Sequence, residues 1–371
     1  MSETPHSPGD VMSVGMASDA RGTIVTPDVR DLVQVEQVLT QWLAPRLHAR
    51  DLRLTDLTYP RGSGQSHETI MFDAHWREGG VKRAEGFVVR IKPSHFTVFY
   101  DDMFIEEYEL MRILGERGTV PIAMVRWLEQ DPAVLGSPFF VMERLHGHVA
   151  VSIPSYLESG WVAEASSAER ARLWENCVRA LASIQTMRVR DVEFLLGPAG
   201  SAGFAREWDR WERYLNRVDR ADRPLPEYRD LLEHLRATIP SHQPEGIVWG
   251  DARIGNMLVD DFEVVALMDW EQPSLGGALH DLGWWLISER GKVAARKGGP
   301  LPGMLGHDET IQLWREITGI STEAIEWYEA FAAFKMGCVL VNLLDLRDRR
   351  PPGDDYAGMF HVRTARELLG M

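Results

Sequence analysis

The sequence predicts an α+β protein of two lobes, a small N-terminal lobe built on a mixed β-sheet and a mostly helical C-terminal lobe. Residues 52–141 alternate between short strand-like runs and helix-like runs, which predicts the sheet lobe. From Val149 onward, apolar residues recur mainly at helical spacing. The chain has 371 residues, 44% hydrophobic and 26% charged, and is long enough for two hydrophobic cores.

The N-terminal region begins with a stretch that lacks periodicity. Residues 1–26 are rich in Ser, Thr, Pro, Gly and Asp, so we expect a disordered tail. The first lobe should then span residues 27–143. A helix is predicted to begin at Pro27 and Asp28, because apolar residues follow at helical spacing. These are Leu32, Val35, Leu39, Trp42 and Leu43.

Two strands, residues 52–59 and 69–76, flank a loop with two glycines at residues 61–68. Such a loop can hold nucleotide phosphates against its backbone N–H groups and the Ser66 hydroxyl, since glycine permits a close approach. A simple hairpin turn explains the same glycines equally well.

A third strand is predicted at residues 87–92. Strand alternation places Arg90 and Lys92 on one side. Two basic residues on a strand usually face water, which is the alternative to a role in phosphate binding. The next helix, residues 102–117, carries several glutamates, including Glu107. A further strand and turn follow at residues 137–147.

The C-terminal lobe, residues 144–371, should contain several long helices. Ser166 and Glu169 form a capping box at the start of one helix. Residues 204–218 predict a second helix, rich in aromatic and charged side chains, and residues 325–344 predict a third. Two cysteines, Cys177 and Cys338, occupy apolar helix positions, which favours a reducing compartment over a disulfide framework.

The most informative segment contains Asp251, Asn256 and Asp269. Strand-like residues 246–248 lead into it, residues 257–259 lead out, and a turn at Asp260 and Asp261 returns the chain through residues 264–268. The three side chains should therefore meet at one end of a hairpin. They would supply a proton acceptor for a hydroxyl and two oxygen ligands for Mg²⁺. Asp and Asn are also common in ordinary turns, so the spacing alone is a weak signal.

This segment resembles the active sites of kinases. Protein kinases carry an Asp-x-x-x-x-Asn loop followed by Asp-Phe-Gly, whereas Trp270 and Glu271 follow Asp269 here. The combination is more similar to the aminoglycoside phosphotransferase family of small-molecule kinases. Within that family, it is most similar to the kinase-like domains fused to some acyl-CoA dehydrogenases. The resemblance covers about residues 50–345 and implies a bilobal protein-kinase-like fold.

The resemblance also implies an activity and a set of catalytic residues. The γ-phosphoryl group of Mg-ATP would pass to a hydroxyl of a small molecule. Asp251 would accept or orient the hydroxyl proton, and Asn256 and Asp269 would hold Mg²⁺. The family usually has His where this chain has Trp249, which we interpret as a structural substitution. Asp281, in a second matching segment, should brace the catalytic loop.

For nucleotide binding, the resemblance points to the first lobe. Arg90 would bind phosphates and pair with Glu107, with Lys92 as the second choice for the cation. Ser66 would contact the triphosphate, although His67 replaces the family's usual Asn beside it. The adenine would lie beside Met142 and bind the backbone at two further positions. These are Glu143 and Leu145.

The sequence leaves three functional classes possible, and the first two differ in the acceptor. The amines of aminoglycosides would require carboxylates in the binding cleft, and Glu271 is placed to offer one. Hydroxylated acyl compounds or other metabolite alcohols would instead bind in an apolar cleft. The third class is a weakly catalytic nucleotide-binding regulator. Residues that could form the apolar cleft are Trp208, Trp211, Trp284, Trp285 and Met336.

The net charge of −15 argues against a nucleic-acid partner, which would require clustered Lys and Arg. We find no apolar stretch of membrane-spanning length and no signal peptide. The expected protein is therefore cytoplasmic and does not bind membranes. We expect it to act as a monomer or homodimer on a small-molecule hydroxyl substrate.

Overall fold

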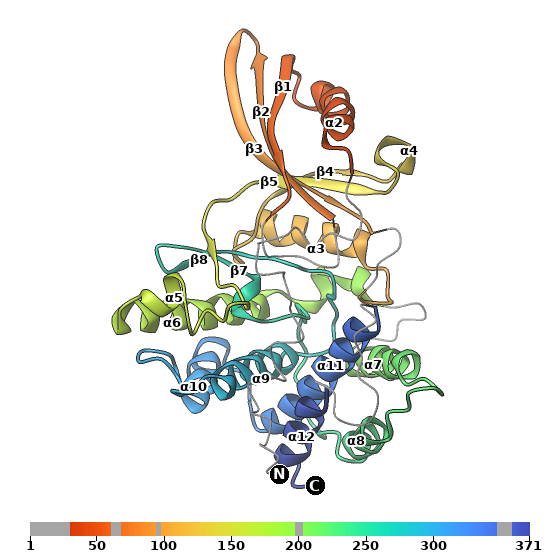
Figure 1. Ribbon diagram of the computed structural model, residues 1–371, viewed down its shortest axis with the longest axis vertical. Coiled ribbons are helices and arrows are strands. Elements are labelled where there is room, and N and C mark those ends of the chain that lie inside the picture. The colour runs from red at the N-terminus through yellow and green to blue at the C-terminus, as the bar shows by residue number, and fades with distance from the viewer. Residues whose placement is uncertain (1–29, 61–67, 94–97, 197–202, 347–357) are drawn as a thin grey trace, which may run out of the picture. The chain divides into compact units, whose positions relative to one another are not determined.

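The computed structural model describes residues 30–60, 68–93, 98–196, 203–346 and 358–371 (Figure 1). The predicted tail at residues 1–26 and Ser66 lie outside the described residues. The chain divides into two compact units. The described part of the sheet unit comprises residues 30–60, 68–93, 98 and 108–147. That of the helical unit comprises residues 99–107, 148–196, 203–346 and 358–371.

The sheet unit is built on five strands in the order β1-β2-β3-β5-β4. Each neighbouring pair in this sheet is antiparallel, rather than mixed as the sequence predicted, because β1, β2 and β3 follow one another through short connections. The strands are β1 (Arg50–Thr58), β2 (Glu68–Glu78), β3 (Val81–Ile91), β4 (Val125–Glu129) and β5 (Phe139–Glu143). The helices are α2 (Leu32–Arg46), the short α4 (Pro132–Leu135) and α3 (Phe104–Arg117), which enters this unit at Tyr108.

Helix α2 covers part of this sheet with one apolar face. Asp31 is its N-cap and accepts a hydrogen bond from Val33 N at 2.9 Å. The predicted start, Pro27 and Asp28, lies outside the described residues. The helix-spaced residues Val35, Leu39, Trp42 and Leu43 are buried, as predicted, in a core shared with Leu54, Phe72, Phe87, Val89 and Phe139. This core fixes β3, the strand that carries Arg90.

The helical unit contains most of the helices and a three-stranded sheet. Its strands are β6 (His148–Val149), β7 (Met257–Asp260) and β8 (Glu263–Leu267). Its longer helices are α6 (Ser167–Ser183), α7 (Phe204–Val218), α8 (Pro226–Ala237), α9 (Leu279–Ala295), α10 (His307–Thr318), α11 (Ile325–Leu346) and α12 (Gly358–Leu368). Short elements are α5 (Trp161–Glu164) and the 3-10 turns η2 (Ile184–Thr186), η3 (Val189–Asp191), η4 (Glu193–Leu195) and η6 (Ile254–Asn256).

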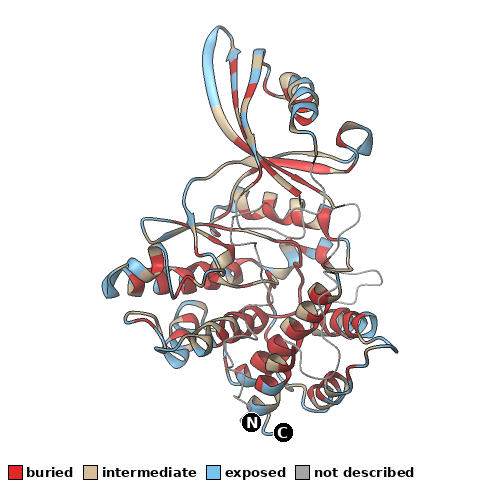
Figure 2. Cartoon of the chain, viewed as in Figure 1, coloured by how far each residue is buried: buried red, intermediate tan, exposed pale blue. Residues whose placement is uncertain are grey.

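Helix α11 forms the centre of the helical unit. It packs against α7, α8, α9 and α12, and buried residues dominate its surface and that of α9 (Figure 2). A helix that is apolar nearly all round is expected in such a central position. The α+β fold class and the three long helices are confirmed, with α7 beginning and ending at the predicted residues.

Two local predictions for these helices are also confirmed. The capping box pairs Ser166 N with Glu169 Oε2 at 2.7 Å, and Glu169 N with Ser166 Oγ at 3.3 Å. Cys177 and Cys338 are buried, free thiols. Among the helices of the described residues, none has the length and apolar character that a membrane span requires.

Candidate active site

The β7-β8 hairpin carries the site predicted from the sequence. Its turn contains Asp261 and Phe262, whose positive φ angles of 44° and 63° suit a tight hairpin. Asp260 is the last residue of β7 rather than part of the turn. The predicted incoming strand at residues 246–248 is wrong except for Val248, which forms one bridge with Ser274. Ile247 does not pair with a strand because its backbone N–H and carbonyl bond instead to the side-chain amide of Gln185, at 3.3 and 2.9 Å.

Asp251 lies in the loop that leads into this hairpin, and its side chain is 20% exposed. Its Oδ2 accepts hydrogen bonds from Asn256 Nδ2 at 2.7 Å and from Arg253 Nε at 2.9 Å. Its Oδ1 accepts one from the indole Nε1 of Trp284 at 3.0 Å. Three donors from different directions therefore fix the orientation of this carboxylate.

Asn256 is the buried last residue of η6, immediately before β7. Its amide nitrogen donates to Asp251 Oδ2 and to the Asp251 carbonyl at 3.1 Å, which directs the amide nitrogen toward Asp251. The backbone carbonyl of Asn256 accepts a hydrogen bond from Met268 N at 2.9 Å. Because Asp269 is the next residue, this bond brings the three predicted catalytic residues together.

Asp269 has a φ angle of +63°, a left-handed conformation that is uncommon for residues other than glycine. Such conformations concentrate at functional sites, where the surrounding structure maintains them. Here, Trp249 Nε1 donates to the Met268 carbonyl at 2.8 Å and Trp270 Nε1 donates to the Leu267 carbonyl at 2.9 Å. The two indoles hold the backbone immediately before Asp269.

Arg253 is a site residue that the sequence reasoning missed. Burial acts to lower its pKa. The carboxylates of Asp251, Asp269 and Glu271 act more strongly in the opposite direction and raise it. Its position two residues after Asp251 was the available signal, because a cation beside transferred phosphoryl groups is a recurring part of such sites.

The catalytic loop is braced by Asp281 near the start of α9, as predicted. Asp281 Oδ2 accepts from Trp249 N at 2.6 Å, and Oδ1 accepts from Gly250 N at 2.9 Å. Burial raises the pKa of Asp281 to about 6, although these two bonds act to lower it. Gly250 has a φ angle of +107°, and a Cβ there would lie 2.6 Å from the Gln272 carbonyl oxygen.

Trp249, predicted to have a structural role, is fully buried and packs on Trp270 with ring centroids 5.8 Å apart. Together with its bond to Met268, this packing confirms that Trp249 has a structural role. Its indole thus supports the loop through one hydrogen bond and one ring contact.

A cavity of about 220 Å³ opens beside Asp251. Its cations are Arg253 and Lys292, and Asp251 is the only acidic residue among the described residues that line it. His361 also lines it, and burial lowers the pKa of His361 to about 4, so this imidazole is neutral at pH 7. Apolar side chains from α9, α11 and α12 complete the wall, including Trp284, Ile287, Met336, Val339, Leu340, Leu343 and Phe360.

The predicted apolar cleft is therefore only partly correct. Trp284 and Met336 line the cavity, but Trp285, Trp208 and Trp211 are buried in the core and are not among its lining residues. Glu271 is also buried and does not line this cavity. The sequence could not show that α12 supplies Phe360 and His361, because this contact joins distant parts of the chain.

An ionic cluster lies buried behind the cavity wall. Lys335 of α11 lies 3.4 Å from Glu207 Oε1 and 5.4 Å from the ring centroid of Trp284. Glu207 Oε2 lies 3.5 Å from Arg210 Nη1 and accepts a hydrogen bond from Ser274 Oγ at 2.9 Å. Paired charges of this kind offset one another's loss of solvation.

The sheet unit holds most of the residues predicted to bind nucleotide. Arg90 on β3 is only 8% exposed, so it is not a solvated surface cation. Met142 and Glu143 end β5, and Leu145 follows. The backbone N–H of Glu143 donates to the Met124 carbonyl at 3.0 Å. This N–H is therefore already engaged within the sheet unit.

Comparison with known protein families defines the chain further. The model of the phosphotransferase enzyme family matches residues 62–315, more than half of the chain. The chain belongs to this family. The match includes Asp251, Asn256 and Asp269, and the family is one of phosphotransferase enzymes.

Sequence relatives of this phosphotransferase include long acyl-CoA dehydrogenases. It is 26% identical to IBR3 of Arabidopsis thaliana, an acyl-CoA dehydrogenase by name, over 76% of this chain and 35% of the relative. It is 24% identical to human acyl-CoA dehydrogenase family member 11, over 74% of this chain and 36% of the relative. The chain thus spans about a third of the length of these relatives.

Solved structures share the fold of the phosphotransferase. A Ralstonia eutropha protein assigned to the aminoglycoside phosphotransferases superposes with a TM-score of 0.61 at 23% identity, covering 90% of this chain and 95% of that one. Aminoglycoside phosphotransferase APH(4)-Ia, in a ternary complex with ADP and hygromycin B, gives a TM-score of 0.56 at 12% identity, covering 90% and 98%. The protein-kinase-like fold is therefore confirmed.

Proposed function

We propose that this phosphotransferase moves the γ-phosphoryl group of Mg-ATP to a hydroxyl of a small molecule. The observation that carries the proposal is the convergence of Asp251, Asn256 and Asp269 at one end of the hairpin, beside a cavity. Asp251 faces this cavity and would accept the hydrogen bond, and then the proton, of an acceptor hydroxyl. Trp284 and Arg253 would keep its carboxylate in that orientation.

The residues present fit a magnesium ion. Mg²⁺ prefers oxygen ligands and is usually bound through one or two carboxylates together with substrate phosphates. Asp269 offers a carboxylate, and Asn256 offers its amide oxygen because its amide nitrogen is engaged by Asp251. Bound Mg²⁺ would offset the negative charge of the phosphates.

The nucleotide would bind to the first lobe, residues 27–143. Arg90 and Glu107 are both buried charges, 8% and 1% exposed, so neither is a solvated surface charge. Met142, Glu143 and Leu145 would receive the adenine, and Ser66 the phosphates. ATP use is further supported by the ADP and AMP-PNP complexes of structures that share the fold.

For the acceptor, the cavity favours an alcohol with an apolar part over an aminoglycoside. Aminoglycosides are polycations, and the described lining residues offer no carboxylate besides Asp251, which the reaction uses. The lining instead combines two cations with side chains of α9, α11 and α12 that are mostly apolar. Hydroxylated acyl compounds and related metabolite alcohols would suit this lining.

The test is Mg-dependent ATP consumption by the purified protein with a panel of aminoglycosides and hydroxylated acyl compounds. We expect turnover with acyl compounds, and a loss of about a hundredfold or more in Asp251→Asn with ATP affinity nearly unchanged. Unchanged turnover in the variant would remove Asp251 from the mechanism. Tight Mg-ATP binding without turnover on any acceptor would instead favour a nucleotide-binding regulator.

A further inference from the structure

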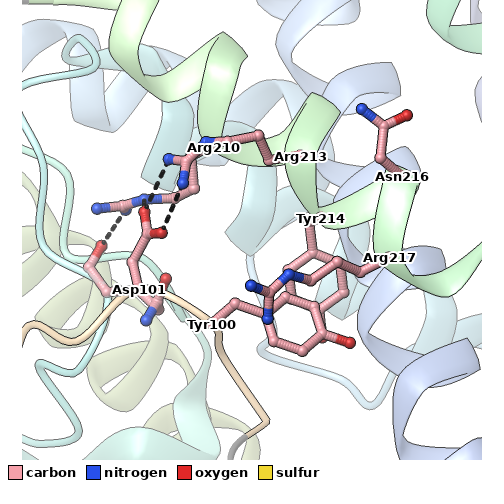
Figure 3. A pocket seen from close by; sticks show the side chains of 8 residues that line it. Tyr100, Asp101, Arg210, Arg213, Tyr214, Asn216 and Arg217 are labelled. Carbon is pink, nitrogen blue, oxygen red and sulfur yellow. Dashed lines mark hydrogen bonds and ion pairs between the residues drawn. The ribbon is translucent and has the colours of Figure 1, made fainter.

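A second cavity, of about 280 Å³, lies along α7 and is distinct from the one beside Asp251 (Figure 3). Three arginines of α7 line it, Arg210, Arg213 and Arg217, with Asp101 as the only carboxylate among the described lining residues. This excess of positive charge is unexpected in a chain with a net charge of −15. The proposed reaction assigns no role to this cavity.

The arginines follow one face of α7. Arg206, Arg210, Arg213 and Arg217 are separated by four, three and four residues, the spacing of neighbours on a helix surface. Like charges at this spacing repel one another. Burial, and then the charge of Arg210, lowers the pKa of Arg206. Its Nη1 is buried without a hydrogen-bond partner among the described residues.

The three cavity arginines differ in how they are held. Arg210 is buried, and its guanidinium donates to Asp101 Oδ2, to the Gln272 carbonyl and to the Pro273 carbonyl, each at 3.2 Å. It is therefore a fixed part of the wall. Arg213 is exposed and shares Asp101 through contacts of 3.1 and 3.3 Å.

Arg217 is the arginine available to a ligand. Its guanidinium carbon lies 4.4 Å from the ring centroid of Tyr100, and within the described residues it makes no hydrogen bond or ion pair. Tyr100 in turn packs on Tyr214 at 4.8 Å. Stacking fixes the plane of a guanidinium and leaves its edge free for two parallel hydrogen bonds to an oxyanion.

We propose that this cavity binds a phosphate-type oxyanion through Arg217, with Arg213 beside it. The inference rests on the proposed function where it concerns the acceptor. Gln272 also lines the cavity, three residues after Asp269, so the oxyanion would lie near the catalytic segment. The oxyanion is either a group carried by the acceptor molecule or a free anion.

The direct test is binding of pyrophosphate by calorimetry, with Mg-ADP saturating the nucleotide site. We expect Arg217→Gln to weaken pyrophosphate binding at least tenfold while Mg-ADP binding is unchanged. Arg220→Gln is the matched control, because Arg220 is an exposed arginine outside the cavity that pairs with Asp222. Equal pyrophosphate affinity in wild type and Arg217→Gln, both folded by circular dichroism, would overturn the proposal.

Turnover then distinguishes the two sources of the oxyanion. If the acceptor carries it, Arg217→Gln raises KM for an alcohol bearing a phosphate ester and leaves KM for its uncharged analogue unchanged. If the anion is free, pyrophosphate binding is lost while both KM values stay the same. The binding experiment needs no turnover, so its failure is separate from a failure of the proposed reaction.

Discussion

At the scale of single residues, the orientation of Asp251 is the feature on which the proposed chemistry depends. Its carboxylate is held by an amide, a guanidinium and an indole from three positions in the chain. Positioning supplies much of the rate in phosphoryl transfer, so loss of one donor should reduce turnover without abolishing it.

We therefore predict that Trp284→Phe lowers kcat about tenfold, because an aromatic ring is kept while the N–H donor to Asp251 is lost. Steady-state kinetics at saturating ATP would measure this effect. Trp285→Phe is the matched control, since Trp285 is buried on the same helix but is not among the described residues that line the cavity. Equal losses in both variants would mean that the effect comes from packing.

Protonation of Asp281 should set the acid limit of activity. Its pKa in the folded protein is about 6, above the ordinary value of 3.8, because it is buried. The charged form accepts both backbone N–H groups of the catalytic loop. We predict that kcat falls as the pH drops below about 6, and that Asp281→Asn has a lower kcat with a flatter profile in this range.

The same shift has the opposite effect on stability. The folded state binds the proton more tightly than the unfolded state, so the contribution of Asp281 is fully present below pH 3.8 and is lost as the pH rises through 6. Denaturant unfolding of wild type and Asp281→Asn across pH 4–7 would measure the difference. If the free energy of unfolding changes with pH equally in both proteins, the raised pKa of Asp281 is contradicted.

At the scale of elements, the catalytic loop is shaped by one glycine. Gly250→Ala would place a Cβ 2.6 Å from the Gln272 carbonyl oxygen, in a backbone conformation with φ of +107° that alanine rarely adopts. We predict a destabilisation of about 1–3 kcal/mol and a loss of most activity. Gly319→Ala is the control, because Gly319 also has a positive φ but an added Cβ there meets no atom within 4 Å. Equal activity in both variants would show that contact with Gln272 is unimportant.

Elements with a strong local signal could be predicted from the sequence. The helix spacing at residues 204–218 and the capping box at Ser166 gave correct helices because these features depend only on neighbouring residues. The hairpin around Asp261 was predicted for the same reason. The strand at residues 246–248 was wrong, because three apolar residues do not reveal that the distant Gln185 side chain occupies the backbone groups of Ile247.

Only the part of the site that belongs to the sequence motif could be predicted. The spacing of Asp251, Asn256 and Asp269 pointed to one place in the fold, and the structure brings them together. The cavity could not be predicted, because α9, α11 and α12 meet only through tertiary packing. Lys292 and His361 carry no local signal of their position in it.

At the scale of the whole molecule, nucleotide binding should couple to stability. A ligand that binds only the folded state at one hundred times its Kd adds about 2.7 kcal/mol. We predict that Mg-ATP raises the Tm of the wild-type protein by several degrees and that Asp269→Asn loses most of this increase. An equal increase in the variant would remove Asp269 from metal binding. ATP with a chelator is the control in both proteins.

The relatives of this chain set its context at the same scale. It spans about a third of the acyl-CoA dehydrogenases that it matches, so the phosphotransferase fold is one part of those longer proteins.

The hydrogen bonds to Asp251 have a consequence for the direction from which an acceptor can approach. A carboxylate offers about four lone-pair positions, and internal donors fill three of those of Asp251. The remaining position, on Oδ1, suffices for one hydroxyl. The reacting hydroxyl should therefore approach Oδ1, the oxygen that also accepts the hydrogen bond of Trp284.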